Sequence, residues 1–208
     1  VKPGAETQRA TIVQRLEFAG LRVLVGIARV LPLETLASLG GVVMGIVGPR
    51  LRQNKRALAN LRIAFPEKSA SELDAIARAM WVNVGRTYAE TLTLDRLAAD
   101  PSRLEVVDLA KWTAEAQKPQ SIVGCTLHMG NWEIAIQPFS LFGRTPAGVY
   151  KAFDNPLIDA WLKKTRSALF PGGLLGKGGD DNAEGQRTAR QLIEKARSGG
   201  TLGFVADH

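Results

Sequence analysis

The sequence predicts an α/β fold, in which helices flank a central sheet that is mostly parallel or mixed. A helical, membrane-associated N-terminal segment precedes this sheet. Three observations lead to this prediction. Short β-rich runs alternate with helical runs from residue 104 onward. The first third of the chain differs from the rest in charge and apolar content. The length of 208 residues with 45% hydrophobic content is enough to bury a core.

The alternating part begins after a long predicted helix at 69–94, where Ser69 and Glu72 have the spacing of a capping box. The β-rich runs are RLEVVD (103–108), SIVGCTL (121–127), PAGVY (146–150) and GTLGFVAD (200–207), and the helical runs lie near 109–117, 131–142, 155–169 and 183–198. The glycine-rich run FPGGLLGKGGDDNAEG fails the spacing of a phosphate loop, so we expect a mobile surface loop there.

The N-terminal segment carries the net charge of the chain. Residues 1–65 hold ten Lys or Arg and three Asp or Glu, which gives +7, whereas residues 66–208 hold seventeen of each. Gln8, Arg15, Arg22 and Arg29 recur every seven residues and form one polar stripe on an otherwise apolar helix. Such a helix suits an anionic membrane surface better than a span, and the alternative is a soluble helical subdomain whose arginines are solvated. We therefore divide the chain into a basic amphipathic membrane-associated segment at 1–65 and an α/β domain at 66–208.

Composition argues against several other classes. The single Cys125 permits no internal disulfide, and two histidines make a histidine-rich metal site improbable. We expect neither a metal nor a cofactor, and the polar first residues contain no signal peptide core. Nucleic-acid binding is disfavoured because Phe18 is the first aromatic residue and Phe65 the next.

The stretch TLHMGNWEIA (126–135) holds the candidate catalytic pair, His128 and Glu133, at a predicted strand-to-helix turn. Five residues along a continuous helix would point these side chains about 140° apart. A turn at Met129–Gly130 and a helix capped by Asn131 and beginning at Trp132 would bring them together. Glu133 would then orient the imidazole and leave it to act as a general base. The spacing by itself also allows an ordinary strand-to-helix corner.

A family resemblance favours the catalytic interpretation. HMGNWE resembles the H-x4-D/E motif of the glycerolipid acyltransferase superfamily, in the form found in lipid A biosynthesis acyltransferases of the lauroyl/myristoyl type. Three further segments are similar to that family in the same order: NKRALANLRIAFPEKSASELDAIARAMWVNVGRTYAE, VYKAFDNPLIDAWLKKTRS and ARSGGTLGFVADH.

The resemblance implies His128 as the base, Glu133 as its partner, and Arg166 and Asp207 as further catalytic residues. For contact with substrate we expect Lys151, Asn131 and Asn155. Two positions depart from the family pattern, because Lys151 stands where arginine is usual and His208 where glutamine is usual. Family members continue beyond the last strand, so we expect this chain to be C-terminally truncated.

The function implied is transfer of a fatty acyl chain from acyl carrier protein to a hydroxyl of a lipid A precursor. Its partners would be the carrier protein, the glycolipid acceptor and an anionic membrane, with no nucleic acid. Its place would be the cytoplasmic face of a Gram-negative inner membrane. Two alternatives stay open: acylation of another lipid, such as a phosphatidylinositol mannoside or a lysophospholipid, and a catalytically silent membrane-binding protein.

Overall fold

The computed structural model describes residues 10–177 and 183–206. The chain divides into two compact units, one of Val1–Val25 with Leu94–His208 and the other of Gly26–Thr93. The helices are α1 (Ile12–Val30), α2 (Leu33–Val47), η1 (Gly48–Arg50), α3 (Arg52–Ala64), α4 (Ala70–Thr91), α5 (Leu94–Ala98), η2 (Pro101–Arg103), α6 (Leu109–Ala116), η3 (Ile134–Ile136), α7 (Gln137–Leu141), α8 (Pro156–Arg166) and α9 (Ala183–Arg197). The strands are β1 (Ile122–Thr126), β2 (Pro146–Tyr150), β3 (Gly173–Gly176) and β4 (Thr201–Val205).

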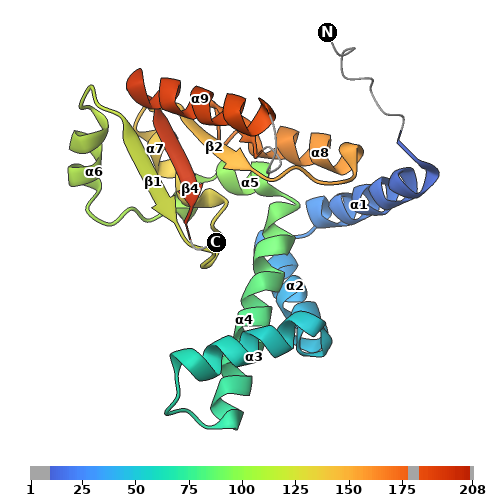
Figure 1. Ribbon diagram of the computed structural model, residues 1–208. Coiled ribbons are helices and arrows are strands. Elements are labelled where there is room, and N and C mark those ends of the chain that lie inside the picture. Colours follow the sequence, from blue (N-terminus) through green and yellow to red (C-terminus); the bar gives the residue numbers. More distant parts are fainter. Residues whose placement is uncertain (1–9, 178–182, 207–208) are drawn as a thin grey trace. The chain divides into compact units, whose positions relative to one another are not determined.

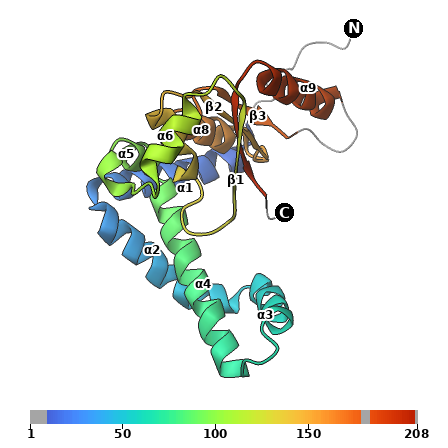
Figure 2. The ribbon, with the colours of Figure 1, turned by 90° about the vertical axis from the view of Figure 1, so that its left-hand side faces the viewer.

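The first unit contains a parallel sheet with the strand order β1-β4-β2-β3. Helix α9 lies on one face of this sheet, and α7 and α8 lie on the other (Figures 1 and 2). The predicted α/β class, with a parallel sheet flanked by helices, is therefore confirmed. Because all four strands run the same way, their carboxyl ends meet at one edge, which is where open α/β sheets bind their ligands.

A row of three glycines sets the spacing between the sheet and the helices on one face. Gly124 and Gly148 both stand in register with Gly203, which lies on the strand between theirs. A Cβ atom on Gly203 would lie 2.5 Å from Ile136 Cδ1, and one on Gly148 would lie 2.5 Å from Phe170 Cε1. The missing side chains therefore allow η3 and the segment after α8 to rest directly on the strands.

Two predictions about strands are wrong. The run at 103–108 is not a strand: η2 ends at Arg103, and Val107 is 73% exposed. A β-rich run becomes a strand only when a neighbour pairs with it, and this one has none among the described residues. Conversely, β3 lies inside the glycine-rich run that was expected to be a loop. Its residues pair with β2 from Ala147↔Gly173 to Tyr150↔Gly176.

The second unit is a helical assembly in which α2 packs along α4 (Figure 1). Close approach depends on Gly40 and Gly85, because a Cβ on either would clash with the backbone of the other. The predicted capping box of α4 is confirmed: the Ser69 amide donates to Glu72 Oε2 over 2.8 Å, and Ser69 Oγ accepts from the Glu72 amide. The division of the chain at residues 65 and 66 stays a prediction.

None of the helices in the described ranges combines the length and the apolar character that crossing a membrane requires.

Candidate active site

The turn after β1 presents His128 at the carboxyl edge of the sheet. The backbone bends there through Gly130, whose φ of +54° lies in the left-handed region that glycine adopts readily. Asn131 Oδ1 then accepts a hydrogen bond of 3.2 Å from the Glu133 amide. The conformation of Gly130 confirms the predicted turn. The predicted helix cap at Asn131 is wrong, because Glu133 is the N-cap residue of η3 and no side chain of the described residues caps that helix. The helix itself begins later than predicted, at Ile134 as a 3-10 turn, while Trp132 and Glu133 remain in the preceding turn.

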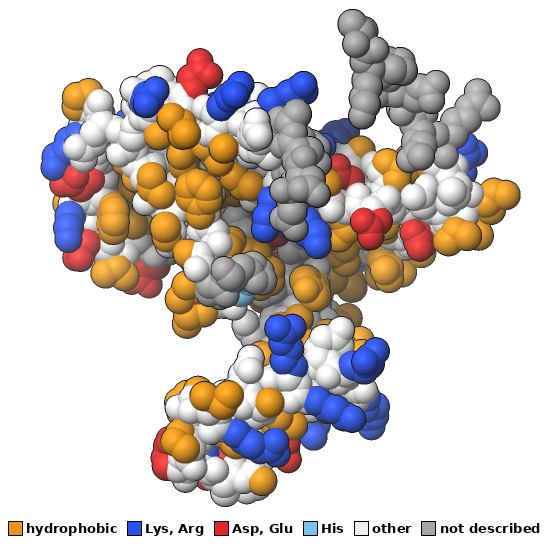
Figure 3. Space-filling view, viewed as in Figure 1, with side chains coloured by type: hydrophobic (Ala, Val, Ile, Leu, Met, Phe, Trp, Pro, Cys, Tyr) orange, Lys and Arg blue, Asp and Glu red, His pale blue; other side chains and the backbone are white. Residues whose placement is uncertain are grey.

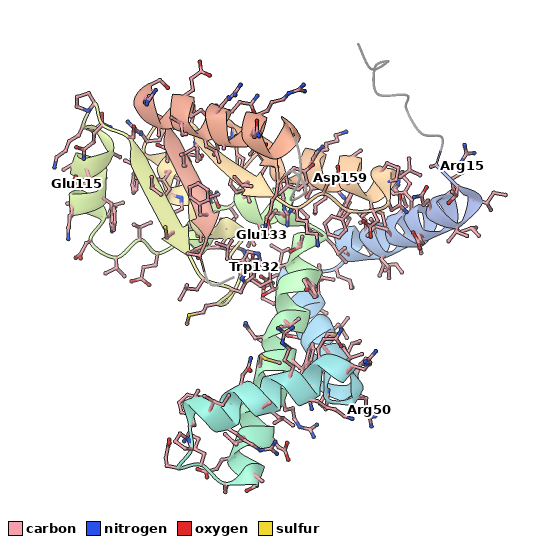
Figure 4. All side chains as sticks on the ribbon, viewed as in Figure 1. Arg15, Arg50, Glu115, Trp132, Glu133 and Asp159 are labelled. Carbon is pink, nitrogen blue, oxygen red and sulfur yellow. The ribbon has the colours of Figure 1, made fainter. Side chains whose placement is uncertain are left out.

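His128 is exposed, and its ring stands edge-on against Trp132, with 4.8 Å between the ring centroids and 62° between the planes. Trp132 and Glu133 lie side by side in Figure 4, in the turn that leads to η3. The indole restricts the imidazole to a limited range of orientations. The turn thus gathers an exposed base candidate, an aromatic neighbour and a carboxylate within six residues.

Glu133 is 6% exposed and is held by Arg166. Arg166 Nε donates to Glu133 Oε2 over 2.8 Å, and Nη2 donates to Oε1, so the pair is bidentate. The guanidinium neutralises the buried carboxylate and fixes the direction of both its oxygens. Each carboxylate oxygen can accept a second hydrogen bond, so Glu133 keeps capacity for another donor.

The glycine row explains how two residues 33 positions apart come to meet. Ile136 packs over Gly203, which brings the turn that carries Glu133 down onto the sheet. Phe170 packs over Gly148, and its amide donates to the Arg166 carbonyl, which ties the end of α8 to the same face. The contact between the Glu133 carboxylate and the Arg166 guanidinium therefore depends on the close packing of Ile136 and Phe170 against the glycines of the sheet.

Asn155 lies at the other end of α8, about 16 Å from Arg166 at the helical rise of about 1.5 Å per residue. Its Oδ1 accepts from the amides of Leu157 and Ile158, which caps the helix. Its Nδ2 donates to the Gln14 carbonyl and to Glu17 Oε2, both over 2.9 Å, and so joins α8 to α1. These four contacts are structural, and the predicted contact of Asn155 with substrate stays a prediction.

Two further residues of the predicted site are Lys151 and Asp207. Lys151 follows β2 directly at the carboxyl edge and is exposed. Asp207 lies outside the residues that the structure describes, as does Gln8 of the polar stripe. In the described ranges, no three His, Cys, Asp or Glu side chains gather as ligands for a metal ion.

One polar network was not predicted. Asp159 is 9% exposed and accepts from the Tyr150 hydroxyl over 3.2 Å and from the Phe153 amide over 3.0 Å. Lys163 Nζ lies 3.2 Å from Asp159 Oδ2. Burial raises the pKa of Asp159, but the Phe153 amide and the Lys163 ammonium outweigh it and hold that pKa below its ordinary value.

The signal for this network is present in the sequence of α8. Asn155, Asp159, Leu162 and Arg166 recur at helical spacing, and three of these four positions are polar. Asn155, Asp159 and Leu162 are buried, and Arg166 is mostly buried. A row of polar residues on the inward stripe of a helix indicates a buried network.

A family model described as "Bacterial lipid A biosynthesis acyltransferase" matches residues 3–208 of the chain. A comparison with curated proteins gives no match.

Proposed function

The chain belongs to the bacterial lipid A biosynthesis acyltransferase family, and from this premise we propose a donor, an acceptor and a base for its reaction. Membership in this family identifies the protein as an acyltransferase. We propose that it moves a fatty acyl chain from acyl carrier protein to a hydroxyl of a lipid A precursor. The observation that carries the proposal is the turn after β1, where an exposed histidine precedes a buried carboxylate that is paired with arginine.

In the proposed reaction, His128 takes the proton of the acceptor hydroxyl while the hydroxyl oxygen attacks the thioester carbonyl carbon. The tetrahedral intermediate collapses, the C–S bond breaks, and the thiolate leaves with the proton that the imidazolium returns. Glu133 stabilises the imidazolium that forms between these steps. Arg166 acts through Glu133 as a positioning residue, because its two hydrogen bonds fix the carboxylate.

The dyad is tested by acyl transfer with the variants His128→Ala and Glu133→Gln. A general base contributes roughly 10²–10⁴-fold to the rate, so we expect kcat to fall by about that factor in His128→Ala. We expect a smaller fall in Glu133→Gln, since the imidazole remains. Glu115→Gln serves as the control, because that carboxylate lies on α6 and its side chain is 38% exposed. Activity near that of the control in both variants would refute the dyad.

The acceptor is tested with purified protein and three lipids: a lipid A precursor, a phosphatidylinositol mannoside and a lysophospholipid. We expect a new ester on the lipid A precursor, detected by mass spectrometry as the added acyl mass. An ester formed only on one of the other two lipids would assign the chain to a different acceptor. No ester on any of them, with the acyl thioester intact, would favour the catalytically silent alternative.

We further propose that α1 and α2 each lie against an anionic membrane, which would be the cytoplasmic face of the inner membrane. Along α1, Arg15, Arg22 and Arg29 are exposed. Several large apolar side chains of the same helix are exposed as well: Ile12, Val13, Leu16, Val23, Leu24, Ile27 and Val30. On α2, the side away from α4 exposes Leu39, Val42, Val43 and Ile46 by 50–59%. Exposed Lys and Arg side chains follow on η1 and α3 (Figure 3): Arg50, Arg52, Lys55 and Arg56. Such a combination favours an interfacial position.

Flotation with lipid vesicles tests this proposal. We expect the chain to float with anionic vesicles at low salt, and less with zwitterionic ones. The double variant Arg52→Glu/Arg56→Glu should weaken binding to the anionic vesicles, whereas Val42→Asp/Ile46→Asp should weaken binding to both kinds. Equal flotation of the wild type and both double variants would refute the proposal.

A further inference from the structure

Strand β3 brings a second lysine to the carboxyl edge of the sheet, beside Lys151. The last pair in the ladder between β2 and β3 is Tyr150↔Gly176. Continuing this register, the next residues are Lys151 on the β2 side and Lys177 on the β3 side. The Lys177 amide donates to the Tyr150 carbonyl over 2.7 Å, which fixes its backbone beside the end of β2. Thr188 Oγ1 donates to the Gly176 carbonyl over 2.7 Å and secures the same strand end from α9.

The two lysines follow neighbouring strands and carry like charges. Both side chains are exposed, and no carboxylate of the described residues forms an ion pair with either. Like charges at facing positions of adjacent strands destabilise a sheet. The nearby Lys163 differs, because its ammonium is paired with Asp159 and lies 5.2 Å from the centre of the Tyr150 ring. Among the described residues, no carboxylate thus pairs with the charge of Lys151 or Lys177, and an anionic ligand would neutralise both.

We propose that Lys177 and Lys151 form a phosphate-binding pair that holds a phosphoryl group of one of the two substrates. This inference rests on the proposed function, in which the donor carries a phosphopantetheine phosphate and the acceptor a glycolipid phosphate. Lysine supplies a compact point charge that suits a phosphate from several directions. The pair lies at the same edge of the sheet as the end of β1, from which the turn with His128 begins.

The test compares substrates with and without phosphate. In the donor arm, an acyl thioester of 4′-phosphopantetheine is compared with the thioester of pantetheine. In the acceptor arm, the lipid A precursor is compared with its dephosphorylated form. KM and kcat are measured in detergent micelles for the wild type, Lys177→Gln, Lys151→Gln and the control Lys111→Gln, which changes an exposed lysine on α6.

We expect Lys177→Gln to raise the KM of the phosphorylated substrate roughly threefold to fivefold in one arm, the range that an exposed charge pair supports. The KM of the phosphate-free substrate and the kcat should change less than twofold, as in Lys111→Gln. The arm that responds identifies the donor or the acceptor as the source of the phosphate. If Lys177→Gln prefers the phosphorylated over the phosphate-free substrate as strongly as the wild type does in both arms, the proposed phosphate-binding pair is refuted.

A binding measurement separates this inference from the proposed function. Calorimetry with 4′-phosphopantetheine and with the detergent-dispersed lipid A precursor requires no turnover. Weaker binding of either phosphorylated compound to Lys177→Gln supports the pair even if the wild type transfers no acyl group. Conversely, if the wild type transfers the acyl group while Lys177→Gln shows the same binding and the same KM as the wild type, the phosphate-binding pair is refuted. That result leaves the proposed function unaffected.

Discussion

Replacing Arg166 with glutamine removes the guanidinium that neutralises the buried carboxylate of Glu133. The exposed fraction of the side chain is 6% for Glu133 and 17% for Arg166, so water can replace the lost partner only in part. Removing one member of a buried ion pair costs about 3–5 kcal/mol, because the other charge stays uncompensated. We therefore expect Arg166→Gln to lower the free energy of unfolding by about that amount.

Urea denaturation followed by circular dichroism measures this change, and hydrogen exchange of the β1 amides reports the sheet-bearing unit separately. The matched control is Lys118→Ala, which breaks an exposed pair with Glu115 whose side chains are 52% and 38% exposed. Pairs of that kind contribute about 0–1 kcal/mol. The double variant Glu133→Gln/Arg166→Gln should recover part of the loss, since it leaves no unpaired charge. A loss in Arg166→Gln no larger than in Lys118→Ala would refute the reasoning.

Three further predictions concern the sheet and α8. Gly203→Ala should destabilise the protein by about 1–3 kcal/mol in thermal unfolding, because its Cβ would meet Ile136, whereas the control Gly20→Ala in the open part of α1 should not destabilise it. Asn155→Ala should cost about 1–2 kcal/mol through the lost helix cap, and unchanged exchange of the first α8 amides would contradict this. Asp159→Asn should be less stable than the wild type at neutral pH. The pKa of Asp159 is lowered by the Phe153 amide and the Lys163 ammonium despite burial, so this difference should shrink as the pH falls below 3.8, and a difference independent of pH would count against it.

The sequence predicted those strands whose residues are themselves strongly β-forming and bounded by turns. The runs at 121–127, 146–150 and 200–207 became β1, β2 and β4. Residues 103–108 have similar propensity but pair with no strand in the described part of the chain, whereas β3 is rich in glycine and exists because β2 pairs with it. The composition of a segment does not indicate which other strand will pair with it.

The candidate site likewise has features that the sequence predicts and features that depend on tertiary packing. The turn at Gly130 was predictable, because glycine readily adopts its left-handed conformation. The predicted cap at Asn131 was wrong, because the helix begins only at Ile134. The family resemblance supplied Arg166 as a residue of interest, but its contact with Glu133 could not be read from their separation in the chain. That contact depends on Gly148 and Gly203 letting two segments approach the same face of the sheet.

The sequence by itself determined the family, the α/β class and the local shape of the turn that carries His128 and Glu133. These depend on residue types at short spacing, which act through backbone preferences and helix caps. Only the tertiary structure decided that Arg166 holds Glu133 and that Lys177 stands beside Lys151. Both relations follow from the order and register of parallel strands, which are fixed by hydrogen bonds and packing between segments far apart in the chain.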